Sequence, residues 1–348
     1  MNILNLVRKN ILELKPYTSA RQSHLNGILL DANENSYGSV IDDQGIGINR
    51  YPDPYQNSLR NALSKVINIP VENLFFGVGS DEIIDLLIRI FCVPGKDNII
   101  VCEPTYGVYK VSADINDVEV INAPLTNDYQ LDIKEIKNKI TEKTKIIFLC
   151  SPNNPTSNLL DKDEIKDLAK DANAIVVVDE AYIDFANTKG MIYDAISISN
   201  LLVMRTFSKA WGLAGVRCGY SVANTNITEL LFKVKAPYNL NKLTINAVLE
   251  SLENIKLKEI YTGNIISERE RVYKVLKGNK HVINVLKSDS NFISFKVEDP
   301  KKVFNYIENA GIIIRDRSNQ FNFTGYLRVT IGTEDENSLF LQKLEEIL

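Results

Sequence analysis

Histidine is scarce in this chain, whose 348 residues include only His24 and His281. A histidine-rich metal centre therefore cannot be built, and a His-based catalytic triad would have few candidates, so we expect no metal site. The four cysteines show no C-x-x-C spacing and stand in or beside apolar runs. This pattern predicts reduced, buried thiols in a cytoplasmic protein.

An excess of charge of one sign is also lacking, because 40 Lys and Arg stand against 44 Asp and Glu. The net charge of −4 gives no reason to expect nucleic acid as a partner. The N-terminal segment carries Arg8, Lys9 and Glu13 where a secretion signal needs an uninterrupted apolar region. No apolar run reaches the length of a membrane span, so we expect no membrane association.

Short β-branched runs alternate with segments of helical spacing in the middle of the chain. The predicted strands are Asn98–Cys102, Ile146–Cys150, Ile175–Val178, Leu201–Met204 and Val216–Val222. Asp81–Phe91 and Asp161–Asp171 carry the helical spacing of apolar residues. Strands that alternate with helices indicate an α/β fold with a mostly parallel sheet flanked by helices.

The length of the chain predicts about two domains. Asn241–Lys277 lacks proline and is expected to form one or two helices. After it come predicted strands and helices at Phe292–Val297, Lys301–Ala310, Tyr326–Ile331 and Glu336–Leu348. We therefore predict a large domain over residues 39–251 and a smaller α+β domain over residues 252–348. Residues 1–38 are expected to form an N-terminal arm that wraps the body or joins the small domain.

Polar side chains follow three of the predicted strands, where ligands of open α/β sheets bind. Asn154, Asp179 and Lys209 are expected to converge there. A lysine held among apolar residues has a lowered pKa and becomes a nucleophile toward carbonyls. An aspartate at a strand end can hold a ring nitrogen protonated. The segment Gly77–Asp81, just before a helix, offers free N–H groups for a phosphate.

Each of these features also has a purely structural explanation. A lone lysine after a strand is usually solvated, and Asp179 could cap a turn. The sequence Asn153-Asn154-Pro155 is a turn signal in its own right. Tyr106 and Tyr109 would ordinarily be packing residues. Only the order and spacing of all these residues together can distinguish a functional site from separate structural features.

In that order and spacing, the chain resembles the fold-type I pyridoxal-phosphate aminotransferases, and more narrowly the histidinol-phosphate aminotransferases. The motifs that carry the resemblance are Pro16–Arg21, Leu30–Asn35, Arg50–Asp53, Gly79–Glu82, Pro104–Tyr109, Ser151–Thr156, Asp179–Tyr182, Arg205–Tyr220, Ala236–Tyr238, Ile314–Arg317 and Leu327–Gly332. The Thr-Phe-Ser-Lys sequence ending at Lys209, with Arg217 eight residues on, is highly specific for the cofactor class. The resemblance implies pyridoxal phosphate as cofactor, a seven-stranded sheet in the large domain, and a homodimer.

The resemblance also implies a role for each matched residue. Lys209 would form the internal aldimine and move the substrate proton, and Asp179 would pair with the pyridine nitrogen. Asn154 and Tyr182 would hydrogen-bond the phenolate oxygen, while Tyr106 would stack on the ring. The cofactor phosphate would be held by Ser80, Asp81, Thr206, Ser208 and Arg217, and by Tyr51 of the other subunit. The substrate would be contacted by Tyr17, Asn35, Arg315 and Arg328.

Arg328 is expected to bind the phosphate of one substrate and a carboxylate of glutamate in turn, because guanidinium groups suit both anions. The alternative for Arg315 and Arg328 is a surface ion pair with a neighbour such as Asp316. One position departs from the family pattern, because Ser157 stands where the family has glycine. A positive φ angle there would cost serine more than glycine.

The resemblance implies a ping-pong transamination of L-histidinol phosphate and 2-oxoglutarate to imidazole-acetol phosphate and glutamate, a step of histidine biosynthesis. An aromatic amino-acid aminotransferase, or a phosphothreonine decarboxylase of the same fold, would share the cofactor residues. A non-catalytic binding protein would be expected to have lost some of them. The substrate residues are what distinguish the enzymes from one another.

Overall fold

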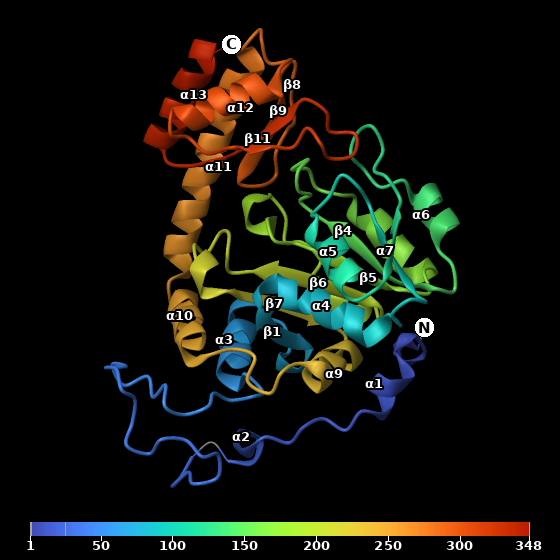
Figure 1. The fold of residues 1–348 in the computed structure, drawn as a ribbon, viewed down its shortest axis with the longest axis vertical. Helices are drawn as coiled ribbons and strands as arrows, with labels where there is room; N and C mark the ends of the chain where they lie inside the picture. Colours follow the sequence, from blue (N-terminus) through green and yellow to red (C-terminus); the bar gives the residue numbers. More distant parts are fainter. Residues whose placement is uncertain (1, 25, 348) are drawn as a thin grey trace.

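The computed structural model, which describes residues 2–24 and 26–347, contains two separate sheets joined by a long helix (Figure 1). The larger sheet has the strand order β1-β7-β6-β5-β4-β2-β3. Its strands are β1 (Leu74–Val78), β2 (Asn98–Val101), β3 (Glu119–Asn122), β4 (Thr144–Cys150), β5 (Ile175–Asp179), β6 (Leu201–Thr206) and β7 (Cys218–Ala223). β7 runs antiparallel to β1 and β6, and the other neighbours are parallel. The prediction of a mostly parallel sheet is confirmed.

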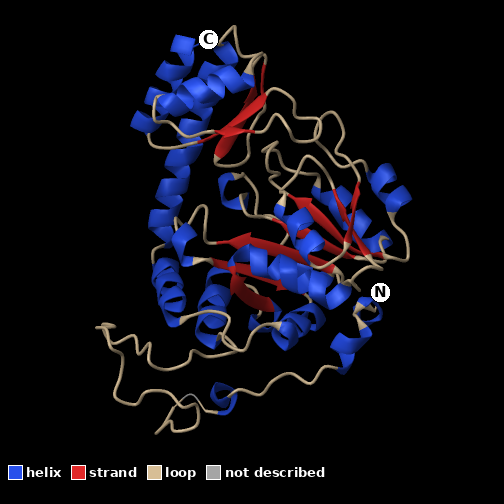
Figure 2. Ribbon diagram, viewed as in Figure 1, coloured by secondary structure: helices blue, strands red, loops and turns tan. Residues whose placement is uncertain are grey.

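Helices cover both faces of this sheet (Figure 2). They are α3 (Asn57–Ile67), α4 (Gly79–Phe91), α5 (Val108–Ile115), α6 (Ile133–Lys139), α7 (Lys162–Asp171), α8 (Asp194–Ser197), α9 (Thr225–Val234) and α10 (Lys242–Glu253). Apolar side chains of α4, α5 and α9 share one core with the sheet, and those of α3, α7 and α10 share the other. Burial on both faces explains why β4, β5 and β6 are nearly continuous apolar runs.

A smaller antiparallel sheet lies at the C-terminal end of the chain, with the order β10-β11-β9-β8. Its strands are β8 (Asn284–Val285), β9 (Phe292–Lys296), β10 (Arg315–Asp316) and β11 (Tyr326–Thr330). Three helices, α11 (Ile255–Gly278), α12 (Pro300–Asn309) and α13 (Glu334–Ile347), form a core of their own with it. The predicted pair of helices after Asn241 is therefore present as α10 and α11, which meet at Asn254.

The N-terminal segment packs against the larger sheet domain. It contains η1 (Ile3–Leu6), α1 (Lys9–Glu13) and α2 (Ala20–Ser23). Ile3, Leu6 and Ile11 lie in the same core as α4 and α9, which offer apolar partners to this amphipathic segment. The chain then runs along the side of the large domain that faces away from the smaller sheet (Figure 1). Of the two placements expected for the arm, wrapping the body or joining the small domain, its contacts with the large domain favour the first. The domain boundaries at residues 38 and 252 stay a prediction.

The four cysteines are buried free thiols, in line with the sequence prediction. Burial raises the pKa of Cys92 and Cys102 to about 12, so both remain protonated and inert. Among the described residues, no helix combines the length and the apolar character needed to cross a membrane.

Candidate active site

A pocket opens at the carboxyl ends of the central parallel strands. It is lined by Ser80, Asp81, Tyr106, Cys150, Asp179, Ala181, Tyr182, Thr206, Ser208, Lys209, Ala214 and Arg217. These side chains come from the start of α4, the ends of β4, β5 and β6, and the loops that follow them. The parallel topology therefore brings together residues up to 137 positions apart, as the sequence predicted for this edge of the sheet.

Asp179 is the last residue of β5 and is 2% exposed. The Tyr109 hydroxyl donates to its Oδ2 at 2.8 Å, and the Ala181 backbone N–H donates to its Oδ1 at 3.0 Å. Burial raises the pKa of Asp179 to about 6, although these two hydrogen bonds oppose the rise. None of the described cationic side chains forms an ion pair with this carboxylate. It is therefore a buried acid ready to pair with a cationic group inside the pocket.

Lys209 follows β6 and extends into the same pocket, with its Nζ 5.5 Å from the centre of the Tyr182 ring. Lys209 is exposed to solvent in this single chain. Desolvation lowers the pKa of Lys209, and the charge of Arg328 lowers it further. A lysine whose neutral amine is favoured in this way can attack a carbonyl carbon.

The start of α4 forms a cradle for a phosphate. Gly79 has φ +71° and leads into Ser80, whose backbone faces Gly219 of β7. A Cβ atom on Gly219 would lie 2.5 Å from the Ser80 nitrogen, so only glycine allows this close approach. Arg217 completes the cradle, with its Nη2 3.1 Å from Asp81 Oδ2 and its Nη1 3.4 Å from Ser208 Oγ. Backbone N–H groups at a helix N-terminus, next to a guanidinium, suit a phosphate dianion.

The donor set of this pocket fits pyridoxal phosphate. The cradle lies at one side, and the unpaired buried carboxylate of Asp179 matches a protonated ring nitrogen. Tyr106 lines the same pocket, its hydroxyl donating to Asp81 Oδ1 at 3.3 Å. Lys209 supplies an amine for the aldehyde of the cofactor. Thirteen-residue α4 adds the positive end of its dipole to the phosphate end.

Asn154 and Tyr182 meet beside the pocket. The Asn154 Nδ2 lies 3.5 Å from the Tyr182 hydroxyl, and both residues are buried. Arg328 Nη1 donates to Asn154 Oδ1 at 2.6 Å, and the Arg328 guanidinium lies over the Phe292 ring at 5.0 Å. Tyr182 also packs edge-on against Phe292 at 5.2 Å. The smaller sheet is therefore in direct contact with the residues at the pocket.

Arg315 and Arg328 are paired across the β10–β11 ladder. Neither forms an ion pair with a carboxylate of the described residues. Asp316 instead accepts hydrogen bonds from the backbone and hydroxyl of Ser318, so the alternative of a surface ion pair with Asp316 is wrong. Burial lowers the pKa of Arg328 to about 10, and the charges of Arg317 and Arg315 contribute to the decrease.

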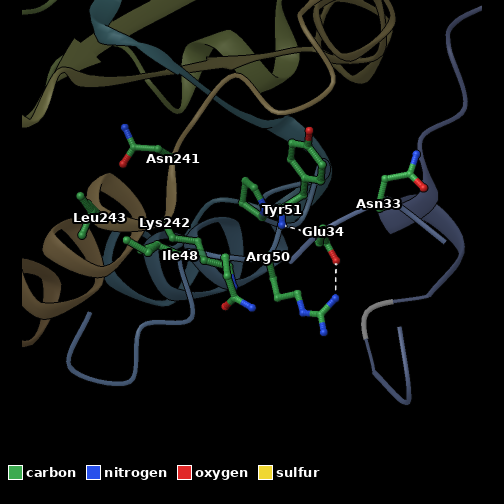
Figure 3. A pocket seen from close by; sticks show the side chains of 11 residues that line it. Asn33, Glu34, Ile48, Arg50, Tyr51, Asn241, Lys242 and Leu243 are labelled. Carbon is green, nitrogen blue, oxygen red and sulfur yellow. Dashed lines mark hydrogen bonds and ion pairs between the residues drawn. The ribbon is translucent and has the colours of Figure 1, made fainter. Parts of the chain in front are cut away.

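Three predicted residues lie outside the pocket in this single chain. Tyr17 is 72% exposed and Asn35 is exposed on the extended arm. Tyr51 stacks on Tyr238 with ring centres 4.5 Å apart, and its backbone N–H donates to Glu34 Oε1 at 2.7 Å. Figure 3 shows Tyr51 and Glu34 at a hollow that is also lined by Lys242 and that does not include Lys209 among its lining residues. Within one chain the structure does not bring these three residues to the site.

The loop after β4 contains Ser157, which stands where the family has glycine. Ser157 has φ +67° and is buried, so serine adopts here the positive angle that glycine permits at lower cost. Its hydroxyl donates to the Thr156 carbonyl at 2.6 Å, and its N–H donates to the Asn153 carbonyl at 2.7 Å. Asn154 still reaches Tyr182 and Arg328, which shows that the serine does not displace it.

Two functional neighbours were not predicted in their observed roles. Tyr109, expected as a packing residue, stacks on Phe148 at 4.8 Å and also holds Asp179. Arg317 directly follows β10, whose Arg315 pairs with Arg328 of β11, and its backbone N–H donates to the Tyr326 carbonyl at 3.0 Å. Tyr109 lies in the motif Pro104–Tyr109 and Arg317 in the motif Ile314–Arg317, but nothing in either motif predicts the hydrogen bond to Asp179 or a role for Arg317.

The whole site lies within a region recognised by one family model. Residues 26–344 match the model for "Aminotransferase class I and II". The chain belongs to the class I and II aminotransferase family. The enzyme class predicted from the sequence is therefore confirmed, as is the fold class.

Curated relatives of this aminotransferase are similar over almost their whole length. A histidinol-phosphate aminotransferase from Cytophaga hutchinsonii is 46% identical, covering 98% of this chain and 98% of the relative. One from Christiangramia forsetii is 41% identical, covering 99% and 98%. A crystal structure of a histidinol-phosphate aminotransferase from Sinorhizobium meliloti, in complex with pyridoxal-5'-phosphate, has a TM-score of 0.80. It shares 20% identity and covers 91% of this chain and 89% of that chain, which shows the common fold.

Proposed function

We propose that this aminotransferase interconverts L-histidinol phosphate and 2-oxoglutarate with imidazole-acetol phosphate and glutamate, as a step of histidine biosynthesis. The observation that carries the proposal is the position of Arg328. Its guanidinium borders the pocket of Lys209 through Asn154 and has no carboxylate partner among the described residues. An anionic end group of a substrate would supply that partner while the amine of the substrate reaches Lys209. The histidinol-phosphate aminotransferases that are 41–46% identical support this substrate.

The cofactor is pyridoxal phosphate, as the sequence predicted for this family. When bound, pyridoxal phosphate supplies an aldehyde that takes up amines and a ring that withdraws electrons from the carbon beside them. Asp179 would hold the proton on the ring nitrogen, because its carboxylate is buried and lacks another cation. Asn154 and Tyr182 would bind the ring oxygen, and Tyr106 would stack on the ring.

The phosphate cradle would fix the position of the cofactor. Ser80 and Asp81 would donate their backbone N–H groups, and Thr206, Ser208 and Arg217 their side chains. The Ser208 N–H already donates to Thr206 Oγ at 3.0 Å, which orders the loop before the phosphate arrives. Binding at this end then requires little rearrangement of the chain.

Lys209 would act as both covalent anchor and proton carrier. Desolvation lowers the pKa of Lys209, which favours the neutral amine that can accept a proton. In each half-reaction Nζ would take a proton from the substrate carbon and deliver it to the other reacting carbon. Glutamate would donate its amino group first, and the keto-phosphate would accept it second.

We also propose that the enzyme is a cytoplasmic homodimer, in which Tyr51 reaches the neighbouring site. Tyr17 and Asn35 would then contact substrate across the same interface. This proposal is supported by the arm, which exposes apolar side chains such as Ile28, Leu30 and Val40 to solvent in a single chain. A second copy of the chain would bury them.

The test is an assay of the purified holoenzyme with histidinol phosphate and 2-oxoglutarate. We expect turnover with this pair to exceed turnover with phenylalanine as amino donor, and expect no decarboxylation of phosphothreonine. Lys209→Ala should lose both the visible absorbance of the bound cofactor and turnover, whereas Lys256→Ala, at an exposed lysine of α11, should retain both. A strong preference for phenylalanine, or unchanged turnover by Lys209→Ala, would contradict the proposal.

A further inference from the structure

Arg317 has a guanidinium group for which the described residues provide no anionic partner. It follows β10, and its backbone N–H donates to the Tyr326 carbonyl at 3.0 Å. Its Nε is buried and makes no hydrogen bond. The adjacent Asp316 is turned toward Ser318 and does not neutralise it. The Nε atoms of Arg8 and Arg269 are equally bare, but the Nη1 atom of each donates to a backbone carbonyl. The Arg317 side chain donates no hydrogen bond to the described residues, so its guanidinium is suited to bind an anionic ligand.

Arg317 belongs to a cluster of three arginines at the edge of the smaller sheet. Arg315 and Arg328 face each other across the β10–β11 ladder, and the Arg328 Nε is likewise buried without a partner. Burial lowers the pKa of Arg317, and the charge of Arg315 lowers it further. Like charges held close together in this way repel each other, and an anion between them would relieve the repulsion.

The arginine cluster lies close to the part of the pocket that contains Lys209. Arg328 Nη1 donates to Asn154 Oδ1 at 2.6 Å, and Asn154 Nδ2 lies 3.5 Å from the Tyr182 hydroxyl. Lys209 Nζ lies 5.5 Å from the centre of the same tyrosine ring. An anion held by the three arginines would therefore be the far end of a molecule whose amine is at Lys209. This geometry distinguishes the cluster from the cradle of Ser80 and Arg217, which lies around the start of α4 and serves the cofactor.

We propose that Arg317 is a specificity-determining residue that selects substrates ending in a phosphate dianion over substrates ending in a carboxylate. The proposal rests on the proposed function and extends it to a residue without an assigned role. Three positive charges attract a dianion about twice as strongly as a monoanion at the same distance. Removal of one guanidinium should therefore lower kcat/KM more for the phosphate substrate than for the carboxylate substrate. The ratio of the two kcat/KM values measures the contribution of Arg317 to this preference.

The experiment compares Arg317→Gln with wild type as holoenzymes. We expect kcat/KM for histidinol phosphate to fall by about 10- to 100-fold, the range for a charge-assisted hydrogen bond, and kcat/KM for phenylalanine to fall by less than about 5-fold. Inhibition by inorganic phosphate should weaken about 10-fold, and inhibition by acetate much less. The cofactor absorbance should stay unchanged, because Arg317 is not part of the cradle.

Two further variants control the comparison. Arg317→Lys keeps the charge but loses the planar fork of donors, so it should recover part of the phosphate preference. Lys302→Gln removes one positive charge from an exposed position on α12 and should leave both substrates within about 2-fold of wild type. If Arg317→Gln folds poorly, Arg317→Lys still tests the proposal through the ratio of phosphate to acetate inhibition.

If Arg317→Gln lowers kcat/KM equally for histidinol phosphate and phenylalanine, the proposed role of Arg317 is wrong. Unchanged inhibition by inorganic phosphate would also contradict it. Failure of the proposed function looks different, because wild type itself would then not use histidinol phosphate. In that case inhibition by inorganic phosphate still reports whether Arg317 binds a dianion.

Discussion

The hydroxyl of Tyr109 donates a 2.8 Å hydrogen bond to Oδ2 of Asp179, and both side chains are buried beneath the pocket. Burial raises the pKa of the Tyr109 phenol well above its ordinary value, so the hydroxyl remains a donor at all working pH values. The bond is stronger to the ionised form of Asp179 than to the protonated form, so it lowers the pKa of this carboxyl. If Asp179 pairs with the ring nitrogen as proposed, Tyr109 is a positioning residue that acts through the aspartate.

Tyr109→Phe should weaken cofactor binding at low pH. The pKa of Asp179, already raised to about 6 by burial, should rise by about one further unit when a stabilising hydrogen bond is lost. Binding of the protonated ring needs the carboxylate, so cofactor affinity falls as the pH drops through this pKa. A spectroscopic titration of the apoprotein with pyridoxal phosphate between pH 5 and 8 would measure the midpoint.

Tyr306→Phe is the matched control for this titration. Tyr306 also donates to a carboxylate at 2.8 Å, that of Glu346, but on the outer helices of the smaller domain. Removal of the Tyr306 hydroxyl should leave the pH midpoint of cofactor binding unchanged. An identical midpoint in wild type and Tyr109→Phe would show that Tyr109 only fills space.

Gly219→Ala should damage the phosphate cradle. The added Cβ would lie 2.5 Å from the Ser80 nitrogen and 2.7 Å from the Gly79 carbonyl carbon, both backbone atoms that cannot move away cheaply. We expect the free energy of unfolding to fall by about 1–3 kcal/mol and the cofactor Kd to rise about 10-fold or more. Thermal unfolding and a cofactor titration would measure the two effects.

Gly263→Ala provides the comparison for that variant. Gly263 lies within α11, where a Cβ would meet nothing within 4 Å. Alanine there should stabilise the helix by about 0.5–1 kcal/mol and leave the cofactor Kd unchanged. The prediction for Gly219 fails if its alanine variant binds pyridoxal phosphate as tightly as wild type.

Glu34→Gln should loosen the N-terminal arm. Glu34 Oε2 accepts from Arg21 Nη2 at 2.6 Å and from Arg50 Nη1 at 2.9 Å, while Oε1 accepts from the Tyr51 backbone. Burial alone would raise the pKa of Glu34, but these hydrogen bonds lower it to about 2. Because the folded pKa is depressed, the stabilisation is complete above the ordinary pKa of glutamate and is lost as the pH falls toward 2.

The loss of stability at neutral pH should be modest, because glutamine keeps hydrogen-bond acceptors at this position and the network orders only the arm. We expect Glu34→Gln to cost about 1–2 kcal/mol of arm ordering and to speed proteolytic cleavage within residues 26–50 about 5- to 30-fold. Glu13→Gln removes a carboxylate from an exposed pair with Lys9 and should leave the cleavage rate unchanged. Equal cleavage rates in wild type and Glu34→Gln would contradict a role for this network.

The strands that are buried on both faces of the sheet were predictable from the sequence, because their residues are almost all apolar. β5, with the sequence Ile-Val-Val-Val-Asp, is a clear case. Two strands were not predicted, namely β1, which reads Leu-Phe-Phe-Gly-Val and lacks β-branched residues until its end, and β3, a partly exposed edge strand of four residues. Edge strands carry a weaker periodic signal because only part of their surface is buried.

At the site, the same reasoning found Asn154, Asp179 and Lys209, because each comes shortly after a buried strand. It did not find the hydrogen bond from Tyr109, which joins residues 70 positions apart and depends on how α5 packs on the sheet. The cluster around Arg317 depends on the register of two strands of two and five residues, which the sequence does not specify. The roles of Tyr17, Asn35 and Tyr51 stay predictions, because they concern a second chain.

The contact between Arg328 and Asn154 fixes the polarity of an amide that could otherwise face either way. A guanidinium can only donate, so the atom of Asn154 that faces Arg328 must be the carbonyl oxygen. The amide nitrogen is thereby turned to the Tyr182 side, where it presents two hydrogen-bond donors and no acceptor. An oxygen that bears negative charge accepts strongly from these donors, whereas a neutral hydroxyl such as that of Tyr182 accepts more weakly.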